Sequence, residues 1–304
     1  MKRMEEKLQL LPLQVLHSYA DPKLVEDDRV LKRLLRLEEF YVPTCDYFKV
    51  VQSEIKPFMR RLVIGWMLDV CEEQQCEDDV FPLAVNIFDR FMGVNIIQKT
   101  QLQLLGSVCL FLASKLRETF ALSAEKLVVY TDNSITMEEL LLWEVLVLNK
   151  LKWDVAGVVA NDFLDYMFSR LNLPECCELS ILRRHSSTYI ALSHIDFLFC
   201  SLNPPSMIAA AAICTSVQGL RQQLGSLCPT LSDMINRVSK LIGVDEDCLR
   251  QCQQRMEEVV RNSLDSTSML SPEHTPDHRM DSENKSPTDE QKPLTPTDVL
   301  DISF

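Results

Sequence analysis

The cysteines and histidines are the residues of this sequence that could bind a metal or act as nucleophiles. His185 and His194 stand nine positions apart on one expected helix, too far for shared ligation, and no H-E-x-x-H occurs. The glycine motifs that hold phosphates, G-x-G-x-x-G and G-x-x-x-x-G-K-[ST], are absent as well. Three close pairs of cysteines occur, and none forms a paired C-x-x-C zinc set: Cys71 with Cys76, Cys176 with Cys177, and Cys248 with Cys252. The sequence therefore predicts no metal, no cofactor and no catalytic residue.

Lys115 is a charged residue near the end of a long apolar stretch, "LLGSVCLFLASKLRE" at 104–118. A helix that is apolar nearly all round is typical of the buried interior of a bundle. A lysine at the end of such a helix costs free energy unless it is paired or reaches water. Lys115 is therefore expected to have a charged partner or to lie at the surface, and it is a candidate for binding another protein.

The totals restrict the class of protein. The chain has 304 residues, 46% hydrophobic and 25% charged, as in soluble globular proteins. Its net charge of −13 argues against nucleic acid as the main partner. Eleven cysteines without framework spacing, and no signal peptide at the start, favour a reducing compartment. The longest uncharged run, 197–220, is interrupted by Asn203-Pro204-Pro205, so no membrane segment is expected.

The elements that must position these residues are helices. Helical periodicity recurs along the chain, and no alternating strand pattern of any length occurs. The first group of expected helices comprises 27–41, 57–73, 79–93, 100–118, 123–130 and 136–151. The second comprises 159–171, 178–200, 205–222, 230–241 and 245–264. After an N-terminal helix there are thus two sets of five helices, each with a third helix rich in small apolar residues. The fold class is all-α, with a duplicated five-helix bundle.

The C-terminal segment, 265–304, differs in composition from the rest. It holds eleven Ser or Thr, five Pro, nine acidic and three basic residues, and too little apolar surface to offset the entropy of ordering. We predict that it is disordered. Four of its prolines follow Ser or Thr, an excess that predicts phosphorylation by proline-directed kinases at Ser271, Thr275, Ser286 and Thr295. The expected organisation is an N-terminal segment 1–26, two bundles at 27–155 and 156–264, and this tail.

Several stretches resemble a known family in order and spacing. "MRRLVIGWMLDVCEEQQCEDDVFPLAVNIFDRF" (59–91), "FLASKLRE", "EKLVVYTDNSI" and "LLLWEVLVLNKLKW" are similar to the first cyclin box of D-type cyclins. "NPPSMIAAAAICTSVQGL" and "DCLRQCQQRMEE" resemble the second box, and "TPTDV" (295–299) resembles the C-terminal signature. The resemblance covers 27–264 and the last ten residues. It implies two five-helix boxes and a regulatory, non-enzymatic subunit of a G1 cyclin-dependent kinase.

The same resemblance implies a kinase-binding surface. In cyclins the lysine of "ASK" and a glutamate of the fifth helix face the kinase, and here these are Lys115 and Glu144. Leu148 and Trp153 would add apolar contact. One alternative is that Lys115 and Glu144 only form an internal salt bridge, although such a pair could also offer hydrogen bonds to a partner backbone. A second alternative is that Trp153 is an ordinary core residue.

A second implied surface lies on the first box helix. Met59, Leu62 and Trp66 share one face, next to a stripe formed by Val63, Met67 and Val70. The resemblance makes the first three a docking groove for short cationic and apolar peptides of substrates and inhibitors, whereas the alternative places all six in the core. Three further residues complete the implied groove: Asp69, which would meet the cation, and Leu102 and Gln103, which would form the far wall.

One family motif is missing. D-type cyclins usually begin with L-x-C-x-E, which docks retinoblastoma-type pocket proteins, but this chain has no cysteine before Cys45. Either pocket-protein substrates are reached through the groove or the kinase, or the chain is a divergent member of the family with other targets. The family further implies cyclin-dependent kinase inhibitors as partners, a ubiquitin ligase acting through Thr295 in the tail, and a location in nucleus and cytoplasm. Two other classes stay open: a kinase-independent or sequestering adaptor in transcriptional regulation, and an all-α enzyme.

Overall fold

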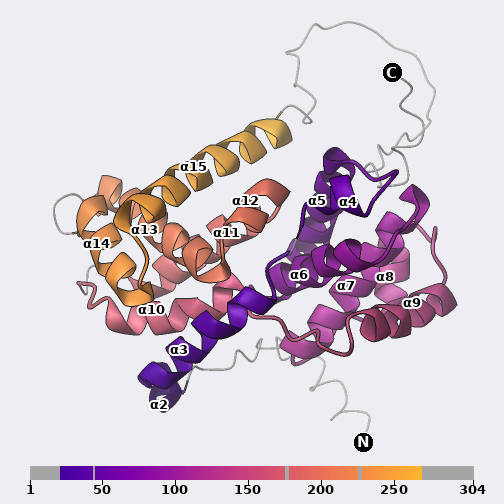
Figure 1. The fold of residues 1–304 in the computed structure, drawn as a ribbon, viewed down its shortest axis with the longest axis horizontal. Coiled ribbons are helices and arrows are strands. Elements are labelled where there is room, and N and C mark those ends of the chain that lie inside the picture. The colour runs from indigo at the N-terminus through magenta and orange to yellow at the C-terminus, as the bar shows by residue number, and fades with distance from the viewer. Residues whose placement is uncertain (1–20, 44, 175–177, 225–227, 269–304) are drawn as a thin grey trace, which may run out of the picture.

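A computed structural model describes residues 21–43, 45–174, 178–224 and 228–268. Helices are the regular elements throughout this part of the chain, and it contains no strand. Figure 1 shows two helical bundles side by side, the first in indigo to magenta and the second in pink to orange. The expected all-α, duplicated architecture is confirmed. None of the helices in these ranges is long and apolar enough to cross a membrane.

The first bundle surrounds one buried helix. Helix α7 (Leu102–Arg117) contacts the other four helices of the bundle, and its residues from Leu102 to Ser114 are buried. Those four helices are α5 (Pro57–Gln74), α6 (Val80–Val94), α8 (Ala124–Tyr130) and α9 (Met137–Lys150). Pro57 begins α5, where its missing N–H leaves no hydrogen bond unmade. The capping box of Thr136 and Glu139 begins α9.

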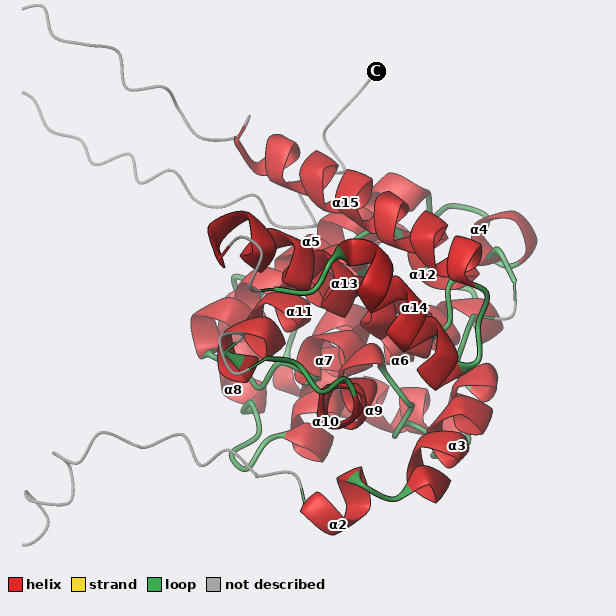
Figure 2. Cartoon of the chain, turned by 90° about the vertical axis from the view of Figure 1, so that its left-hand side faces the viewer, coloured by secondary structure: helices red, strands yellow, loops and turns green. Residues whose placement is uncertain are grey.

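The second bundle repeats this arrangement around α13 (Pro205–Leu224), whose residues Ala209–Ala212 are fully buried. Small side chains let neighbouring helices approach α13 closely, and Figure 2 shows it inside the second bundle. The elements around it are η3 (Ala160–Phe163), α10 (Leu164–Arg170), α11 (Leu179–Ser193), α14 (Leu231–Ile242) and α15 (Glu246–Ser268).

The N-terminal elements join the two bundles. They are α2 (Pro22–Val25), α3 (Asp28–Leu37), η1 (Glu38–Phe40) and α4 (Tyr47–Val50). Leu31 of α3 lies in the core of the second bundle, whereas Tyr47 of α4 lies in the core of the first. The buried carboxylate of Glu38 accepts hydrogen bonds from the backbone N and the hydroxyl of Ser206, both at 2.7 Å, at the start of α13. Desolvation raises the pKa of Glu38 despite these bonds.

The helix expected over 178–200 is wrong: the chain breaks it into α11 and a separate short helix, α12 (Phe197–Leu202). Ser193 donates its hydroxyl to the carbonyl of Ile190, which competes with the continuing helix ladder. Asp196 then caps α12 by accepting from the backbone N of Phe199 at 2.9 Å. The predicted helix 159–171 also differs in detail, since its first turn is the 3₁₀ element η3.

Candidate partner-binding surfaces

Lys115 and Glu144 form an ion pair where the ends of α7 and α9 meet. The Lys115 Nζ lies 2.7 Å from Glu144 Oε1, and it also lies 3.7 Å from the centre of the Phe111 ring. The Lys115 side chain is 40% exposed and that of Glu144 is 15% exposed. Lys115 thus reaches the surface as expected, and its ammonium keeps donors that could bind acceptors of another chain.

Apolar side chains surround this pair on the outer face of α9. Leu141, Leu142 and Val145 are 42%, 71% and 51% exposed. Leu116, which follows Lys115, is also exposed. Sequence reasoning did not single out these residues, because "LLLWEVLVL" is apolar all round and such a run is typical of a buried helix. An exposed apolar helix face beside an ion pair is typical of a protein-binding surface.

Trp153 lies on the surface just after α9. Its indole is 67% exposed and donates to Asn149 Oδ1 at 3.3 Å. Lys152 and Trp153 both have left-handed backbone conformations, with φ of 55° and 63°. Such conformations cost free energy for residues other than glycine, so the surrounding structure must impose the turn. The alternative in which Trp153 is a core residue is wrong. Leu148, by contrast, is 9% exposed and packs in the core of the first bundle.

The two stripes of α5 have different environments. Val63, Met67 and Val70 are buried, so they form the core stripe. Met59 and Trp66 are half-buried, and Leu62 is 47% exposed. The alternative that places all six residues in the core is therefore wrong. Met59, Leu62, Trp66, Asp69, Leu102 and Gln103 are the residues predicted to form a docking groove, and we keep the name docking groove for this predicted set.

Close packing of α5 on α7 brings the parts of the docking groove together. A side chain at Gly106 of α7 would meet Val63 at 3.1 Å and Trp66 at 3.4 Å, so glycine permits this approach. Leu102 and Gln103 lie one turn before Gly106, on the same side of α7. Both are buried, so neither forms the exposed wall that was expected.

Two polar groups of the docking groove are notable. The amide oxygen of Gln103 accepts from the Ser134 hydroxyl at 3.0 Å, but its buried Nε2 has no hydrogen-bond partner. A buried donor without a partner is costly and is often found at binding sites. Asp69 is exposed; desolvation by the surrounding protein raises the pKa of its carboxyl, and the negative charge of Glu72 raises it further. A cationic partner would relieve this effect.

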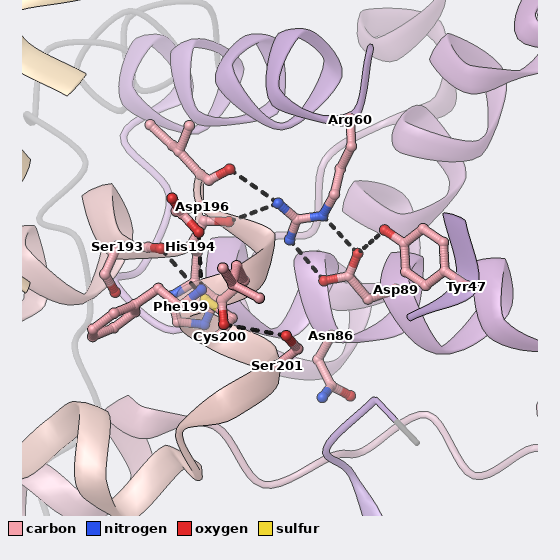
Figure 3. Close-up of polar contacts among 12 residues, drawn as sticks. Tyr47, Arg60, Asn86, Asp89, Ser193, His194, Asp196, Phe199, Cys200 and Ser201 are labelled. Atoms are coloured by element: carbon pink, nitrogen blue, oxygen red, sulfur yellow. Dashed lines mark hydrogen bonds and ion pairs between the residues drawn. The ribbon is translucent and has the colours of Figure 1, made fainter. Parts of the chain in front are cut away.

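A buried arginine next to the groove links the two bundles (Figure 3). Arg60 of α5 is fully buried and forms two 2.7 Å hydrogen bonds with Asp89 of α6. Its Nη1 donates to the carbonyls of His194 and Ile195, where α11 ends. Tyr47 donates to the same Asp89 carboxylate at 2.7 Å. The Arg60 guanidinium thus connects α5 to α6 and to the end of α11 in the second bundle.

Burial and the neighbouring negative charge have opposite effects on the pKa of Arg60. Burial alone would lower the pKa of Arg60, but the Asp89 carboxylate outweighs that effect and raises it, so the guanidinium stays charged. Burial lowers the pKa of His194 to about 4, so its imidazole is neutral at pH 7. Sequence reasoning missed the network. The available signal was Arg60 itself, which shares the buried face of α5 with Val63, Ile64 and Met67.

Three other points concern metal ligands, cysteines and the predicted phosphorylation sites. Among the described residues there is no group of three side chains that could hold a metal ion. The cysteines whose placement is described are free thiols. The four predicted phosphorylation sites, Ser271, Thr275, Ser286 and Thr295, lie outside the described residues.

Comparisons with known proteins agree on one family. Residues 29–156 match the family model described as "Cyclin, N-terminal domain", and residues 158–286 match "Cyclin, C-terminal domain". The chain is 46% identical to the G1/S-specific cyclin-D2 of Xenopus laevis over 290 residues, covering 95% of this chain and 97% of the relative. It is 46% identical to the G1/S-specific cyclin-D3 of Homo sapiens, covering 93% and 94%. The X-ray structure of a viral cyclin from herpesvirus saimiri superposes with a TM-score of 0.68 at 26% identity, covering 77% of this chain and 98% of that one.

Proposed function

Because this chain belongs to the cyclin family, and within it to the G1/S-specific D-type cyclins, we propose that it is the activating subunit of a G1 cyclin-dependent kinase. It is a regulatory subunit and not itself an enzyme. The observation that carries the proposed binding site is the exposed Lys115–Glu144 pair beside the apolar face of α9. That combination suits a partner with apolar side chains and backbone acceptors.

The proposed mechanism is a population shift. An active kinase needs its strand lysine paired with the glutamate of its C helix and an ordered activation loop. A cyclin that binds this arrangement more tightly than the inactive one increases its population. We place the kinase C helix against α7 and α9, with Lys115 and Glu144 bound to its backbone and Leu142, Val145 and Trp153 against its apolar side chains. Leu148 supports this surface from beneath and contributes little contact.

The docking groove is proposed to recruit substrates and inhibitors. A peptide with a cationic residue followed by apolar ones would place its apolar side chains on Met59, Leu62 and Trp66 and its charge near Asp69. The buried Nε2 of Gln103 would gain an acceptor if its side chain turned towards a peptide carbonyl. Since the L-x-C-x-E motif is absent, this groove and the kinase are the proposed routes to retinoblastoma-type pocket proteins, whose phosphorylation would promote G1/S progression.

The groove can be tested apart from kinase binding. Leu62→Asp introduces a charge at an exposed apolar position and should lower the affinity for a cationic-apolar peptide about tenfold or more. Leu202→Asp, on the exposed face of α12, is the matched control and should bind normally. Equal affinities of the two variants, measured by fluorescence anisotropy, would contradict the assignment of the groove.

The tail is proposed to control lifetime and location. Phosphorylation of Thr295 adds close to two negative charges, which could create a recognition mark for a ubiquitin ligase and for nuclear export. The protein would then divide its time between nucleus and cytoplasm. A Thr295→Ala variant should have a longer half-life in cells, measured after synthesis is blocked. An unchanged half-life would contradict this role.

The class of function is tested by co-expression. The chain is produced with each G1 cyclin-dependent kinase in turn, and any complex is purified and assayed for phosphate transfer to a pocket-protein fragment. A stable and active complex is expected with at least one kinase. A stable complex that stays inactive after the kinase is phosphorylated on its activation loop would indicate a sequestering cyclin. No complex with any of the kinases would favour a kinase-independent adaptor.

A further inference from the structure

A hollow of about 260 Å³ lies on the first bundle and shares no residue with the docking groove. It lies between the end of η1 with residues 42, 43 and 45, the end of α6 and the turn after α9. Its apolar lining includes Phe40 and Val94, which are 74% and 59% exposed. Its charged lining includes Arg90, Lys150, Lys152 and Asp154. We call this hollow the Arg90 pocket.

Arg90 has an unmet hydrogen-bonding requirement. Its side chain is 14% exposed, and its buried Nη1 has no hydrogen-bond partner. The nearest carboxylate to its other terminal nitrogen, Nη2, is Asp154 at 3.8 Å, too long for a hydrogen bond. The guanidinium also stacks 4.9 Å above the Tyr41 ring, whose face attracts the cation but is only a weak hydrogen-bond acceptor. A buried cationic donor without an acceptor is rare, so this position suits an acceptor from a bound group.

The charges of the pocket favour an anionic ligand. Lys150 and Lys152 are exposed, and the left-handed turn at Lys152 is imposed by the structure. Of the two lining carboxylates, Asp89 is committed to Arg60, and Asp154 accepts the Tyr41 hydroxyl at 2.9 Å. Three cations therefore face one partly used carboxylate, in a chain whose net charge is −13. The complementary ligand is a peptide with carboxylates next to apolar side chains.

The sequence contains such a peptide at 298–304, "DVLDISF". It has carboxylates at Asp298 and Asp301, apolar side chains between and after them, and no basic residue from 293 to 304. The span 269–297 can extend over about 95 Å at ~3.3 Å per residue. A folded body of this size has a radius of gyration of about 18 Å, so the segment can reach the pocket.

We propose that segment 298–304 docks into the Arg90 pocket of its own chain. Arg90 lines the pocket, and a rotation of its guanidinium lets the now buried Nη1 donate to the Asp301 carboxylate. Asp298 lies near Lys150 and Lys152, and the apolar side chains of the segment cover Phe40 and Val94. The pocket is thus an intramolecular site for the acidic C-terminal segment. Docking would hold Thr295, three residues before Asp298, next to the same lysines, where a phosphate would strengthen the contact.

The proposal is tested on the full chain without kinase, so it does not depend on kinase binding. The photoreactive residue p-benzoylphenylalanine replaces Ile302, the chain is irradiated at low concentration, and the cross-linked peptides are identified by mass spectrometry. Cross-links are expected within one chain, to the peptides that contain Phe40, Val94 or Leu151. Cross-links mainly to other surfaces, or mainly between two chains, would overturn the proposal.

Charge variants provide the matched comparison. Combining Lys150→Glu with Lys152→Glu should lower the yield of these cross-links about tenfold, and less so at high salt. Combining Lys126→Glu with Lys240→Glu reverses two exposed lysines outside the pocket and should leave the yield unchanged. Asp298→Asn with Asp301→Asn should reproduce the loss from the side of the tail. Thermal unfolding of each variant confirms that it is folded. Equal yields in both lysine variants would overturn the proposal.

Discussion

The two bundles have the same order of helices but treat the junction of their third and fifth helices differently. In the first bundle, α7 and α9 meet at the exposed Lys115–Glu144 pair, and α9 exposes Leu142 and Val145. In the second bundle, α13 and α15 meet around Gln253, which is 1% exposed. Its amide nitrogen donates to Thr215, Gln218 and Glu257 at 3.3, 3.4 and 2.6 Å.

The outer faces of the fifth helices differ in the same way. The exposed side chains of α15 in the described part of the chain are polar or charged apart from Cys248, and include Gln254, Arg255 and Glu258. In the second bundle the polar groups at this junction form hydrogen bonds with one another. In the first bundle an ion pair and apolar side chains are exposed at the surface. The two bundles are similar scaffolds, and this difference in surface chemistry is why we propose that the first one binds the kinase.

The largest expected effect concerns the contact between the bundles. Arg60→Ala would leave the Asp89 carboxylate buried without its counter-ion and should lower the free energy of unfolding by about 3–5 kcal/mol. Arg61→Ala, at the exposed neighbouring position, should change it by about 0.5 kcal/mol or less. Urea unfolding measures both. Similar midpoints for the two variants would mean that Arg60 does not join the bundles energetically.

The difference between α9 and α15 can be tested by introducing one aspartate on the exposed face of each helix and comparing the affinities for the kinase. Val145→Asp on α9 places a carboxylate on the proposed kinase-binding face and should weaken association by about 2–4 kcal/mol. Gln254→Asp, exposed on α15, should leave association unchanged. Biolayer interferometry with an isolated G1 cyclin-dependent kinase gives both affinities. Weakening by both variants to the same extent would remove the distinction between the bundles.

The smallest expected effect is on stability, at the junction of α13 and α15 around Gln253. Gln253→Leu keeps the volume but removes the amide donor, leaving the Thr215 hydroxyl and the Glu257 carboxylate less satisfied. The free energy of unfolding should fall by about 1–2 kcal/mol, while kinase affinity stays at the wild-type value. Loss of affinity without loss of stability would show that this junction, too, serves binding.

Much of the fold follows from sequence pattern. The apolar stretches around Gly106 and Ala209–Ala212 identify the two central helices, because their small residues allow the close packing on every side that a central helix needs. The break after Ser193 was not predictable in this way. Ser193 and Asp196 contribute locally, but the carbonyls freed at the break are bound by Arg60, more than a hundred residues earlier. Such long-range contacts leave no periodic signal near the break.

The candidate surfaces show the same limit. Periodicity places Met59, Leu62 and Trp66 on one face of α5 and Val63, Met67 and Val70 on the next. It does not determine which stripe is buried, because both are apolar, and the packing of α7 through Gly106 decides this. The exposed face of α9 was missed for the related reason that an apolar run does not distinguish a core from an interface.

We propose that the kinase binds directly to Lys115 and Glu144. The alternative is that this ion pair only joins the ends of two helices within the first bundle. Lys115→Glu should weaken association by about 2–5 kcal/mol, because like charges would meet at the interface. Adding Glu144→Lys to it restores the internal pair with its ends exchanged, and should recover thermal stability.

The decisive measurement is the kinase affinity of this exchanged double variant, compared with wild type and with Lys240→Glu as an exposed control in the second bundle. In the double variant each of the two positions carries a charge opposite to that of the wild type. The kinase groups that contact them would therefore be repelled, so the variant should be stable and yet bind weakly. Wild-type affinity in the exchanged variant, or in Lys115→Glu alone, would contradict the account.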